Sequence, residues 1–349
     1  MYTEFLLKTS RRYAMNTAQE RSCRGEEAPV MQEQLKLANL LKTVQQQIIG
    51  QQSLIENMFV CLLADGHILL EGMPGLAKTR SAKAIAEGIE GDFHRIQFTP
   101  DLLPSDLIGT EIYIHEKSNF IFRKGPLFNN IILADEINRA PAKVQSALLE
   151  AMEEKQVTVG HMSYPLPELY MVIATQNPIE QEGTYSLPEA QLDRFLMHLE
   201  VDYPTHQEEL LIAELDENRH SRKAFPKVPI TTKEEILEAR RAYPAVHISD
   251  SLKNYVVYLV AATRAPKKYD ANLARWLTHG ASPRATLGII RAAKALAWLK
   301  GDEYVTPTHI HSVALPILRH RIIPSFEAEA EGISRTDIIR KLLEVVAIP

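Results

Sequence analysis

The fold is decided by the stretch Gly72-Met73-Pro74-Gly75-Leu76-Ala77-Lys78-Thr79, which directly follows the apolar run His67–Glu71. The apolar run predicts a buried strand, and the Ala-rich residues after Thr79 predict a helix. A glycine-rich turn between a strand and a helix lets backbone N–H groups converge on phosphate oxygens at the helix N-terminus. In that setting Lys78 reaches the β- and γ-phosphates of a nucleotide, and the Thr79 hydroxyl binds Mg²⁺. The stretch therefore predicts a phosphate-binding loop.

One position departs from the usual pattern, because Ala77 stands where a glycine normally precedes the lysine. Ala adds only a methyl group, and the exchange costs little where the backbone is already helical. Taken alone, the stretch leaves a second interpretation open: a chance Gly-Pro turn before a helix with an exposed lysine.

Short apolar runs alternate with helical stretches around this loop, a pattern typical of a parallel sheet covered by helices. The predicted strands are His67–Glu71, Phe93–Phe98, Asn130–Ala134, Tyr170–Thr175 and Phe195–Val201. Two inserts interrupt the alternation. Residues 99–128 suggest a small excursion from the sheet, and residues 155–169 predict a β-hairpin that turns near Gly160.

Three segments follow from these patterns. Residues 1–30 mix polar and charged types without periodicity and predict a flexible leader, and residues 31–225 form the α/β domain. Residues 226–349 predict a smaller, all-helical domain, because strand-forming runs fade and helix-start signals recur. Those signals are Thr232 with Glu235, Ser249, Ser282-Pro283 and Thr306-Pro307.

Two further strand ends carry polar side chains. Asp135 and Glu136 follow a buried strand, where a parallel sheet carries its ligands. Asp135 would hold Mg²⁺, and Glu136 would activate the attacking water. A solvated acidic turn is the alternative for these two residues alone. Asn177 follows the next strand and could position that water, although a turn before Pro178 explains it equally well.

Two arginines are candidates for contacts with phosphate. Arg194 precedes the last strand, and its alternative role is a surface ion pair. Arg284 lies in the first turn of a predicted helix, where a positive charge opposes the helix dipole. A nearby anion would explain Arg284, and a γ-phosphate would supply one.

Composition narrows the class of protein. The 349 residues carry 39 Lys plus Arg against 44 Asp plus Glu, and the net charge of −5 argues against a dedicated nucleic-acid binder. Cys23 and Cys61 lack metal-ligand spacing, which suggests a reducing compartment without disulfide or zinc. Because no run approaches the roughly 20 apolar residues that span a bilayer, we expect a cytoplasmic protein without a membrane span.

Together these motifs resemble those of the AAA+ ATPases, and in finer detail those of the MoxR family. The resemblance covers roughly residues 35–345. It rests on the motifs Glu71–Thr79, Phe122–Phe128, Ala134–Pro141, Ala174–Pro178 and Leu187–Phe195. It implies an AAA+ P-loop NTPase core with a parallel five-stranded sheet, followed by a smaller helical lid domain.

The resemblance also assigns roles to individual residues. Lys78 and Thr79 would be the Walker A residues, and Asp135 and Glu136 the Walker B residues. Asn177 would be sensor 1, Arg194 the arginine finger and Arg284 sensor 2. Nucleotide-binding residues would be Ile49, Gly50, Gly72, Met73, Pro74, Gly75, Leu76, Ala77, Lys78, Thr79 and Arg80. Ile49, Gly50 and Gln51 would lie at the adenine.

What the resemblance implies for function is an ATPase that uses ATP and Mg²⁺ and assembles as a homo-oligomeric ring, usually a hexamer. Family members act as chaperone-like motors that mature partner proteins or load metal or cofactor into them, often alongside von Willebrand A domain proteins. Both inserts would face the central pore. Two alternatives remain: a nucleotide-dependent switch or scaffold with negligible turnover, which Ala77 favours weakly, and a DNA-directed motor, against which the acidic balance weighs.

Overall fold

The computed structural model describes residues 33–348 except 74, 77, 116–118, 179–182 and 221–229. The predicted leader therefore lies outside the described residues. The predicted boundary between the two domains, at 225, also falls in an undescribed stretch. Residues 33–47 form the first helix, followed by α2 (Gln52–Leu63).

A five-stranded parallel sheet forms the centre of the α/β domain, as predicted. Its strands are β1 (Ile68–Gly72), β2 (Phe93–Gln97), β5 (Ile131–Asp135), β8 (Met171–Gln176) and β9 (Met197–Val201). Their order across the sheet is β2-β5-β8-β1-β9. Because every pairing is parallel, the carboxyl ends of all five strands lie along one edge. The polar residues that follow β1, β5 and β8 are thereby brought together.

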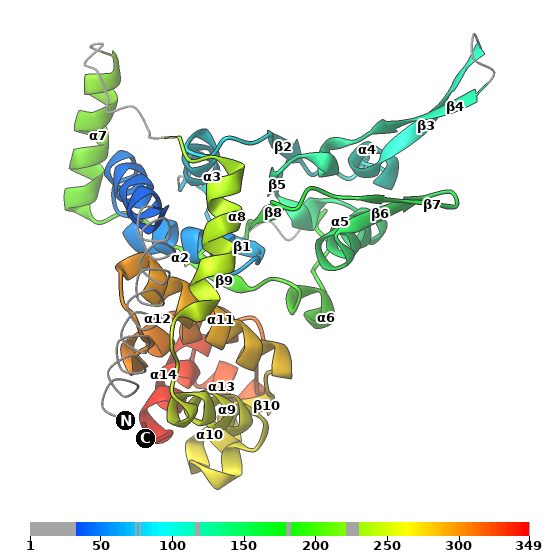
Figure 1. Cartoon of the computed structure of the whole chain (residues 1–349). Helices are drawn as coiled ribbons and strands as arrows, with labels where there is room; N and C mark the ends of the chain where they lie inside the picture. The colour runs from blue at the N-terminus through cyan, green and yellow to red at the C-terminus, as the bar shows by residue number, and fades with distance from the viewer. Residues whose placement is uncertain are drawn as a thin grey trace, which may run out of the picture.

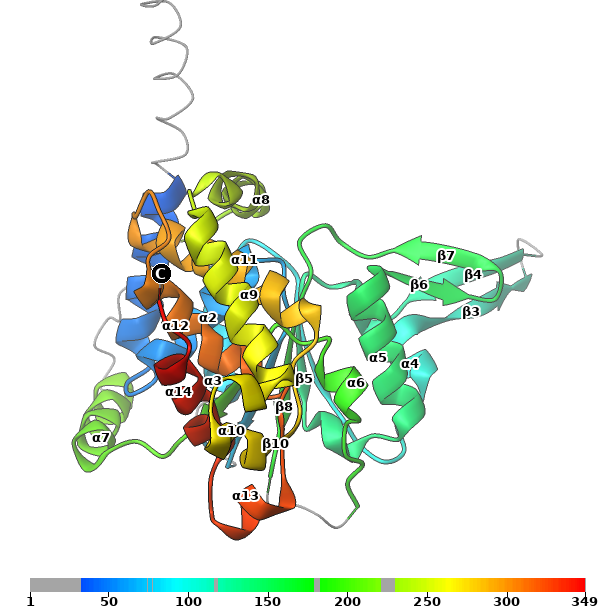
Figure 2. The ribbon, with the colours of Figure 1, turned by 90° about the horizontal axis from the view of Figure 1, so that it is seen from below.

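Alternating side chains divide the core into two layers, one on each face of the sheet. Ile131 and Leu133 of β5 pack with α2, α3 (Lys78–Glu87) and the C-terminal helices. Ile132 and Ala134 pack on the opposite face, against α5 (Ala142–Glu154). Figure 2 shows the strands between these layers, with α4, α5 and α6 on one side and α2, α3, α11 and α12 on the other.

The two inserts are antiparallel hairpins that project from the α/β domain in the same direction (Figure 1). The first contains α4 (Pro104–Ile108), β3 (Gly109–Ile114) and β4 (Asn119–Lys124). The second pairs β6 (Gln156–Val159) with β7 (Met162–Pro165), and it turns at Gly160, whose φ is +61°. The β3–β4 hairpin depends on Gly109, since φ there is +107° and a Cβ would lie 2.2 Å from the Arg123 carbonyl oxygen.

The C-terminal domain is built from helices, as predicted. Its helices are α8 (Lys233–Ala242), α9 (Asp250–Arg264), α10 (Ala271–Trp276), α11 (Pro283–Lys300), α12 (Pro307–Leu318), α13 (Phe326–Ala330) and α14 (Arg335–Val345). Two further helices, α6 (Glu189–Leu192) and α7 (His206–His220), precede this domain. Thr232, Ser249, Ser282 and Thr306 cap α8, α9, α11 and α12. One addition was not predicted: β10 (Leu277–His279) pairs with β11 (Ile323–Pro324).

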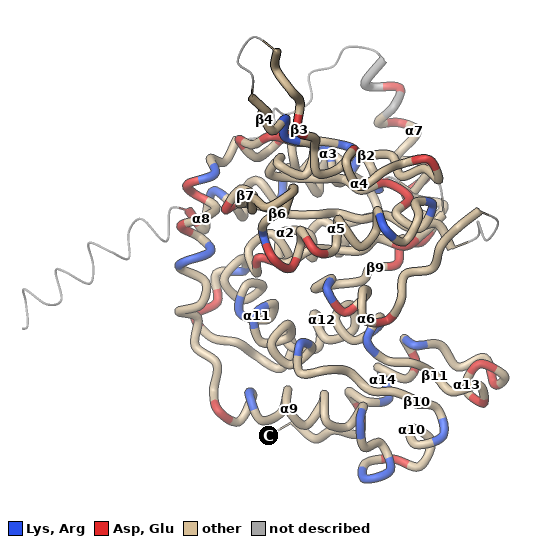
Figure 3. The backbone as a smooth tube through the Cα atoms, turned by 90° about the vertical axis from the view of Figure 1, so that its right-hand side faces the viewer, with Lys and Arg blue, Asp and Glu red and all other residues tan. Residues whose placement is uncertain are grey.

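Charge is distributed over the whole chain. Figure 3 shows acidic and basic residues interspersed along both the α/β domain and the C-terminal helices. Among the described residues, every helix is too short or too polar to cross a membrane.

Candidate nucleotide site

The predicted phosphate loop joins β1 to α3. Gly75 has φ of +85°, a left-handed conformation that favours glycine. Lys78 opens α3, and its Nζ donates hydrogen bonds to the carbonyl oxygens of Gly72 and, at 3.2 Å, Gln176. Burial lowers the pKa of Lys78, and nearby Asp135, Glu136 and Glu71 oppose that shift. The lysine therefore lies across the loop, where it faces the ends of both β1 and β8.

Asp135 is held from both sides at the end of β5. Its Oδ1 accepts a 2.5 Å hydrogen bond from the Thr175 hydroxyl, and its Oδ2 accepts two from the Arg95 guanidinium, at 2.6 and 3.0 Å. The Thr79 hydroxyl lies 3.5 Å from Oδ2. A hydroxyl and a carboxylate this close fit the oxygen ligands that Mg²⁺ prefers. Thr79 and Asp135 could therefore hold this cation together.

Glu136 adopts a left-handed conformation, with φ of +57° and ψ of +52°. Such backbone is uncommon for a residue other than glycine and clusters at functional sites. This backbone conformation is held by a hydrogen bond that the Glu136 N–H donates to the Thr175 hydroxyl at 2.9 Å. The carboxylate meets Gln97 Nε2 at 2.8 Å and Arg139 Nε at 3.1 Å. The turn thus places Glu136 beside Asp135, with both carboxylates engaged by cationic or amide donors.

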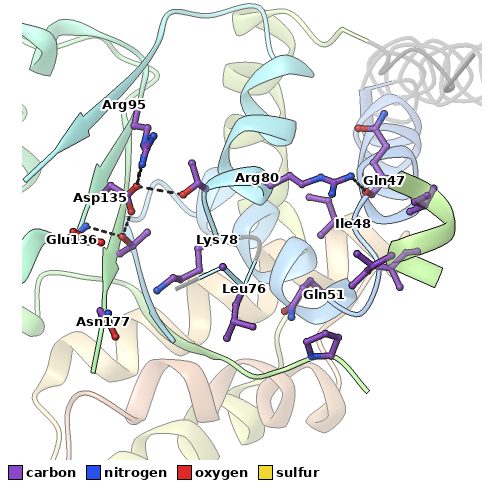
Figure 4. A pocket seen from close by; sticks show the side chains of 17 residues that line it. Gln47, Ile48, Gln51, Leu76, Lys78, Arg80, Arg95, Asp135, Glu136 and Asn177 are labelled. Carbon is purple, nitrogen blue, oxygen red and sulfur yellow. Dashed lines mark hydrogen bonds and ion pairs between the residues drawn. The ribbon is translucent and has the colours of Figure 1, made fainter. Parts of the chain in front are cut away.

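A cavity of about 500 Å³ opens over these side chains. This volume suits a nucleotide-sized ligand. Its described lining residues are Gln47, Ile48, Ile49, Gln51, Gly75, Leu76, Lys78, Thr79, Arg80, Arg95, Asp135, Glu136, Thr175, Asn177, Pro204, Ile212 and Leu215. Figure 4 shows Lys78, Asp135, Glu136 and Asn177 at one end and Gln47, Ile48 and Gln51 at the other. The end with Gln47, Ile48 and Gln51 also receives apolar side chains from α7, so this apolar end could hold a base.

Most of the predicted nucleotide-binding residues border this cavity, but some do not. Gly50 allows the turn before α2, with φ of +77°, and its Cα faces the Glu208 side chain instead of the cavity. Gly72 and Met73 are not among the residues that line the cavity. Pro74 and Ala77 lie outside the described residues. Arg80 borders the cavity and donates to the Gln47 carbonyl oxygen at 3.3 Å.

Asn177 is buried and lines the cavity directly after β8. Its carbonyl oxygen lies 3.4 Å from Asn138 Nδ2, which ties the end of β8 to the segment after Glu136. Asn177 therefore lies in the same cavity as Lys78, Asp135 and Glu136.

Arg194 and Arg284 lie elsewhere, in a separate cleft of about 250 Å³ that Arg291 also borders. Arg194 donates to the Leu149 carbonyl oxygen at 2.7 Å and pairs with Glu153 at 3.1 Å. Arg284 pairs with the same Glu153. The charge of Arg284 at the start of α11 is therefore compensated within the chain, so it requires no γ-phosphate. Arg194 thus forms its ion pair with Glu153. Its sequence neighbour Asp193 pairs instead with Arg321.

Several residues that shape the site were not predicted from the sequence. Arg95 and Gln97 alternate on β2, and each meets one of the two acids. Thr175 holds both acids from β8, while Ile212 and Leu215 of α7 close the apolar end of the cavity. The alternation of polar residues in Phe93–Gln97 was the one available signal, since it marks a strand with a polar face.

A phosphate loop, two strand-end acids and a buried amide on this strand order, with a helical domain after the sheet, define the AAA+ class of P-loop ATPases. Residues 67–197 match the family model described as ATPase family associated with various cellular activities (AAA), and residues 272–342 match the AAA lid domain. The chain belongs to the MoxR family of AAA+ ATPases.

Individual relatives cover most of the chain. Chaperone MoxR1 of Mycobacterium tuberculosis is 46% identical over 86% of this chain and 79% of its own length. Protein MoxR of Paracoccus denitrificans is 32% identical over 82% of this chain and 88% of its own. A crystal structure of a candidate ATPase from Cytophaga hutchinsonii is 48% identical, with a TM-score of 0.86 over 94% of this chain and 99% of that one.

Proposed function

We propose that the protein hydrolyses ATP with Mg²⁺, at sites that two neighbouring subunits share within a homo-oligomeric ring, a hexamer. One observation carries the proposal: Lys78, Asp135 and Glu136 border the nucleotide cavity, whereas Arg194 and Arg284 border another cleft. An arginine that stabilises the γ-phosphoryl group during its transfer must contact that group. These two arginines can therefore serve the nucleotide of an adjacent chain.

The chain's own groups divide the chemistry among them. Thr79 and Asp135 would hold Mg²⁺, which would supply positive charge to neutralise the phosphates in the transition state. Lys78 Nζ exchanges the carbonyl oxygens of Gly72 and Gln176 for phosphate oxygens. Glu136 leaves Gln97 and Arg139 to accept a proton from the attacking water, which the Asn177 amide orients. Arg95 donates two hydrogen bonds to Asp135 Oδ2, so a cation at this oxygen would compete with the guanidinium.

For the biological role, we propose a chaperone-like motor that acts on a protein client in the cytoplasm, in maturation or in metal or cofactor loading. A von Willebrand A domain protein is the proposed partner. The name of the relative from Mycobacterium tuberculosis supports this, and so do the two projecting hairpins. Five apolar side chains on them are exposed: Ile112, Tyr113, Phe120, Ile121 and Met162. Exposed apolar residues of this kind mark surfaces for protein contact.

The first experiment separates an ATPase from a nucleotide-dependent switch. Steady-state phosphate release is measured for wild type and Glu136→Gln, with binding of a fluorescent ATP analogue measured in parallel. We expect Glu136→Gln to bind ATP with unchanged affinity and to lose most turnover, because its amide cannot accept the proton. Negligible turnover by the wild type would favour the switch, and unchanged turnover by Glu136→Gln would contradict the role of Glu136.

The second experiment tests the shared site. Arg194→Ala subunits lack the finger but keep their own cavity, and Lys78→Ala subunits have a damaged cavity but keep the finger. Each variant alone should be nearly inactive. Mixed before assembly, they should regain part of the activity, since some sites then combine an intact cavity with an intact Arg194. A mixture no more active than its components would refute catalysis across the interface.

A further inference from the structure

The most completely satisfied buried charge among the described residues is Arg321, just beyond α12. Its side chain is 3% exposed, and it stands in the C-terminal domain opposite the segment that contains Arg194. Nε donates to Asp193 Oδ1 at 2.7 Å, and Nη2 donates to the carbonyl oxygens of Asp193 and Phe195 at 3.1 and 2.6 Å. Nη1 donates to the carbonyl oxygen of Leu196 at 3.1 Å and to that of Ile317 at 2.6 Å. The guanidinium therefore contacts the chain on both sides of Arg194.

Neighbouring groups of the same domain hold this segment as well. Ser282, the cap of α11, donates to Asp193 Oδ2 at 3.0 Å, and His320 Nε2 lies 3.0 Å from the Phe195 carbonyl oxygen. The Arg194 side chain is fixed separately, by Leu149 and Glu153 of α5. Arg194 thus has its backbone held by the C-terminal domain and its side chain held by the α/β domain.

Burying a guanidinium is costly unless its donors are paired. Burial lowers the pKa of Arg321, and the Asp193 carboxylate opposes that shift. A hydrocarbon side chain could fill the same volume without this cost. What a hydrocarbon cannot do is fix the positions of several carbonyl oxygens at once, which the rigid, forked guanidinium does.

We propose that Arg321 is the positioning residue for Arg194, and that through it the C-terminal domain sets the place of Arg194 at the subunit interface. This inference rests on the proposed shared site. It adds a direct coupling: a shift of α12 relative to β9 moves the backbone of Asp193 and Phe195, and with them the base of the Arg194 side chain.

The test uses Arg321→Met, which keeps the length of the side chain and removes its donors. We expect kcat of the assembled protein to fall about 10²-fold, the cost of misplacing a catalytic group by about 1 Å. The affinity of its own cavity for a fluorescent ATP analogue should stay unchanged, because Arg321 borders the other cleft and does not line that cavity. Mixing Arg321→Met with Lys78→Ala should restore activity, as for Arg194→Ala, since the defect lies in what the subunit gives its neighbour.

The matched control is Arg319→Met. Arg319 lies two positions earlier, is equally buried, and contacts Thr336 Oγ1 at 2.9 Å and Glu200 Oε2 at 3.2 Å. It lacks the bonds to the Asp193–Leu196 segment, so its kcat should remain near that of the wild type even where thermal stability falls. An equal loss of kcat in both variants would show a structural role only and overturn the proposal.

Two further outcomes are distinct. Recovery by the Arg194→Ala mixture without recovery by the Arg321→Met mixture overturns the positioning role and leaves the shared site intact. Failure of both mixtures refutes the shared site, and the positioning role with it. If Arg321→Met does not fold, Asp193→Asn replaces it. This variant keeps the shape and removes the charge that faces Nε, and it should show the same selective loss of kcat and the same recovery, at smaller amplitude.

Discussion

Thr175 offers a direct test of how the two acids are held, through the variant Thr175→Val. The residue is 1% exposed, and its hydroxyl serves both acids: it donates to Asp135 Oδ1 at 2.5 Å and accepts from the Glu136 N–H at 2.9 Å. Valine has nearly the same shape but neither capacity. A buried donor left without a partner costs about 1–3 kcal/mol, and a hydrogen bond to a charged group contributes about 1.5–3 kcal/mol.

Asp135 keeps its contacts with Arg95 after the exchange, so the full sum is not expected. We predict that Thr175→Val lowers the free energy of unfolding by about 2–4 kcal/mol, a large fraction of a typical total. Urea unfolding of the nucleotide-free protein, followed by circular dichroism, measures the change. Thr175→Ser keeps the hydroxyl and should lose only about 1 kcal/mol, for the buried methyl group. Equal stability of the valine variant and the wild type would refute this reasoning.

Two further predictions concern a metal and a proton. Arg95→Ala should strengthen Mg²⁺ binding about three- to fivefold, because the metal no longer competes with a partly exposed ion pair worth up to about 1 kcal/mol. A Mg²⁺ titration of nucleotide binding measures this change, and weaker binding would show that Arg95 helps to bind the nucleotide. His67 is buried with Nδ1 accepting from the Val172 N–H at 3.0 Å, and burial lowers its pKa from 6.5 to about 4. Between those values the unfolded chain binds more protons, so stability should fall as pH drops from 6.5 to 4, by up to about 3 kcal/mol. His67→Gln should reduce this loss in urea unfolding at several pH values, and an identical pH profile would contradict it.

Local sequence patterns were sufficient to predict those strands and helix starts that depend on residues close together in the chain. Short apolar or alternating runs predicted each strand of the central sheet, and caps such as Thr232 and Ser249 predicted helix starts. The parallel arrangement then brings Lys78, Asp135 and Asn177 to one edge without further information.

Contacts between distant segments could not be derived in this way. Arg95 meets Asp135 because β2 lies beside β5, and strand order is a property of the whole sheet. Glu153, on α5, neutralises Arg284 of α11 although 131 positions separate them. The positive charge of Arg284 at the helix start therefore does not require a phosphate nearby. Gly50 lies in the turn before α2, next to residues that line the cavity, but the turn directs it toward Glu208.

The position of β1 within the sheet has a consequence for synthesis of the chain. This strand leads into the phosphate loop, yet its two partners are Met171–Gln176 and Met197–Val201, both encoded much later. Such long-range pairings form slowly, because distant segments must meet first. During synthesis on the ribosome, β1 therefore has no partner strand until about a hundred further residues have been made. At common elongation rates this takes roughly 5–20 seconds. A nascent chain that ends before Met197 lacks one of the two partner strands of β1, the strand that leads into its phosphate loop.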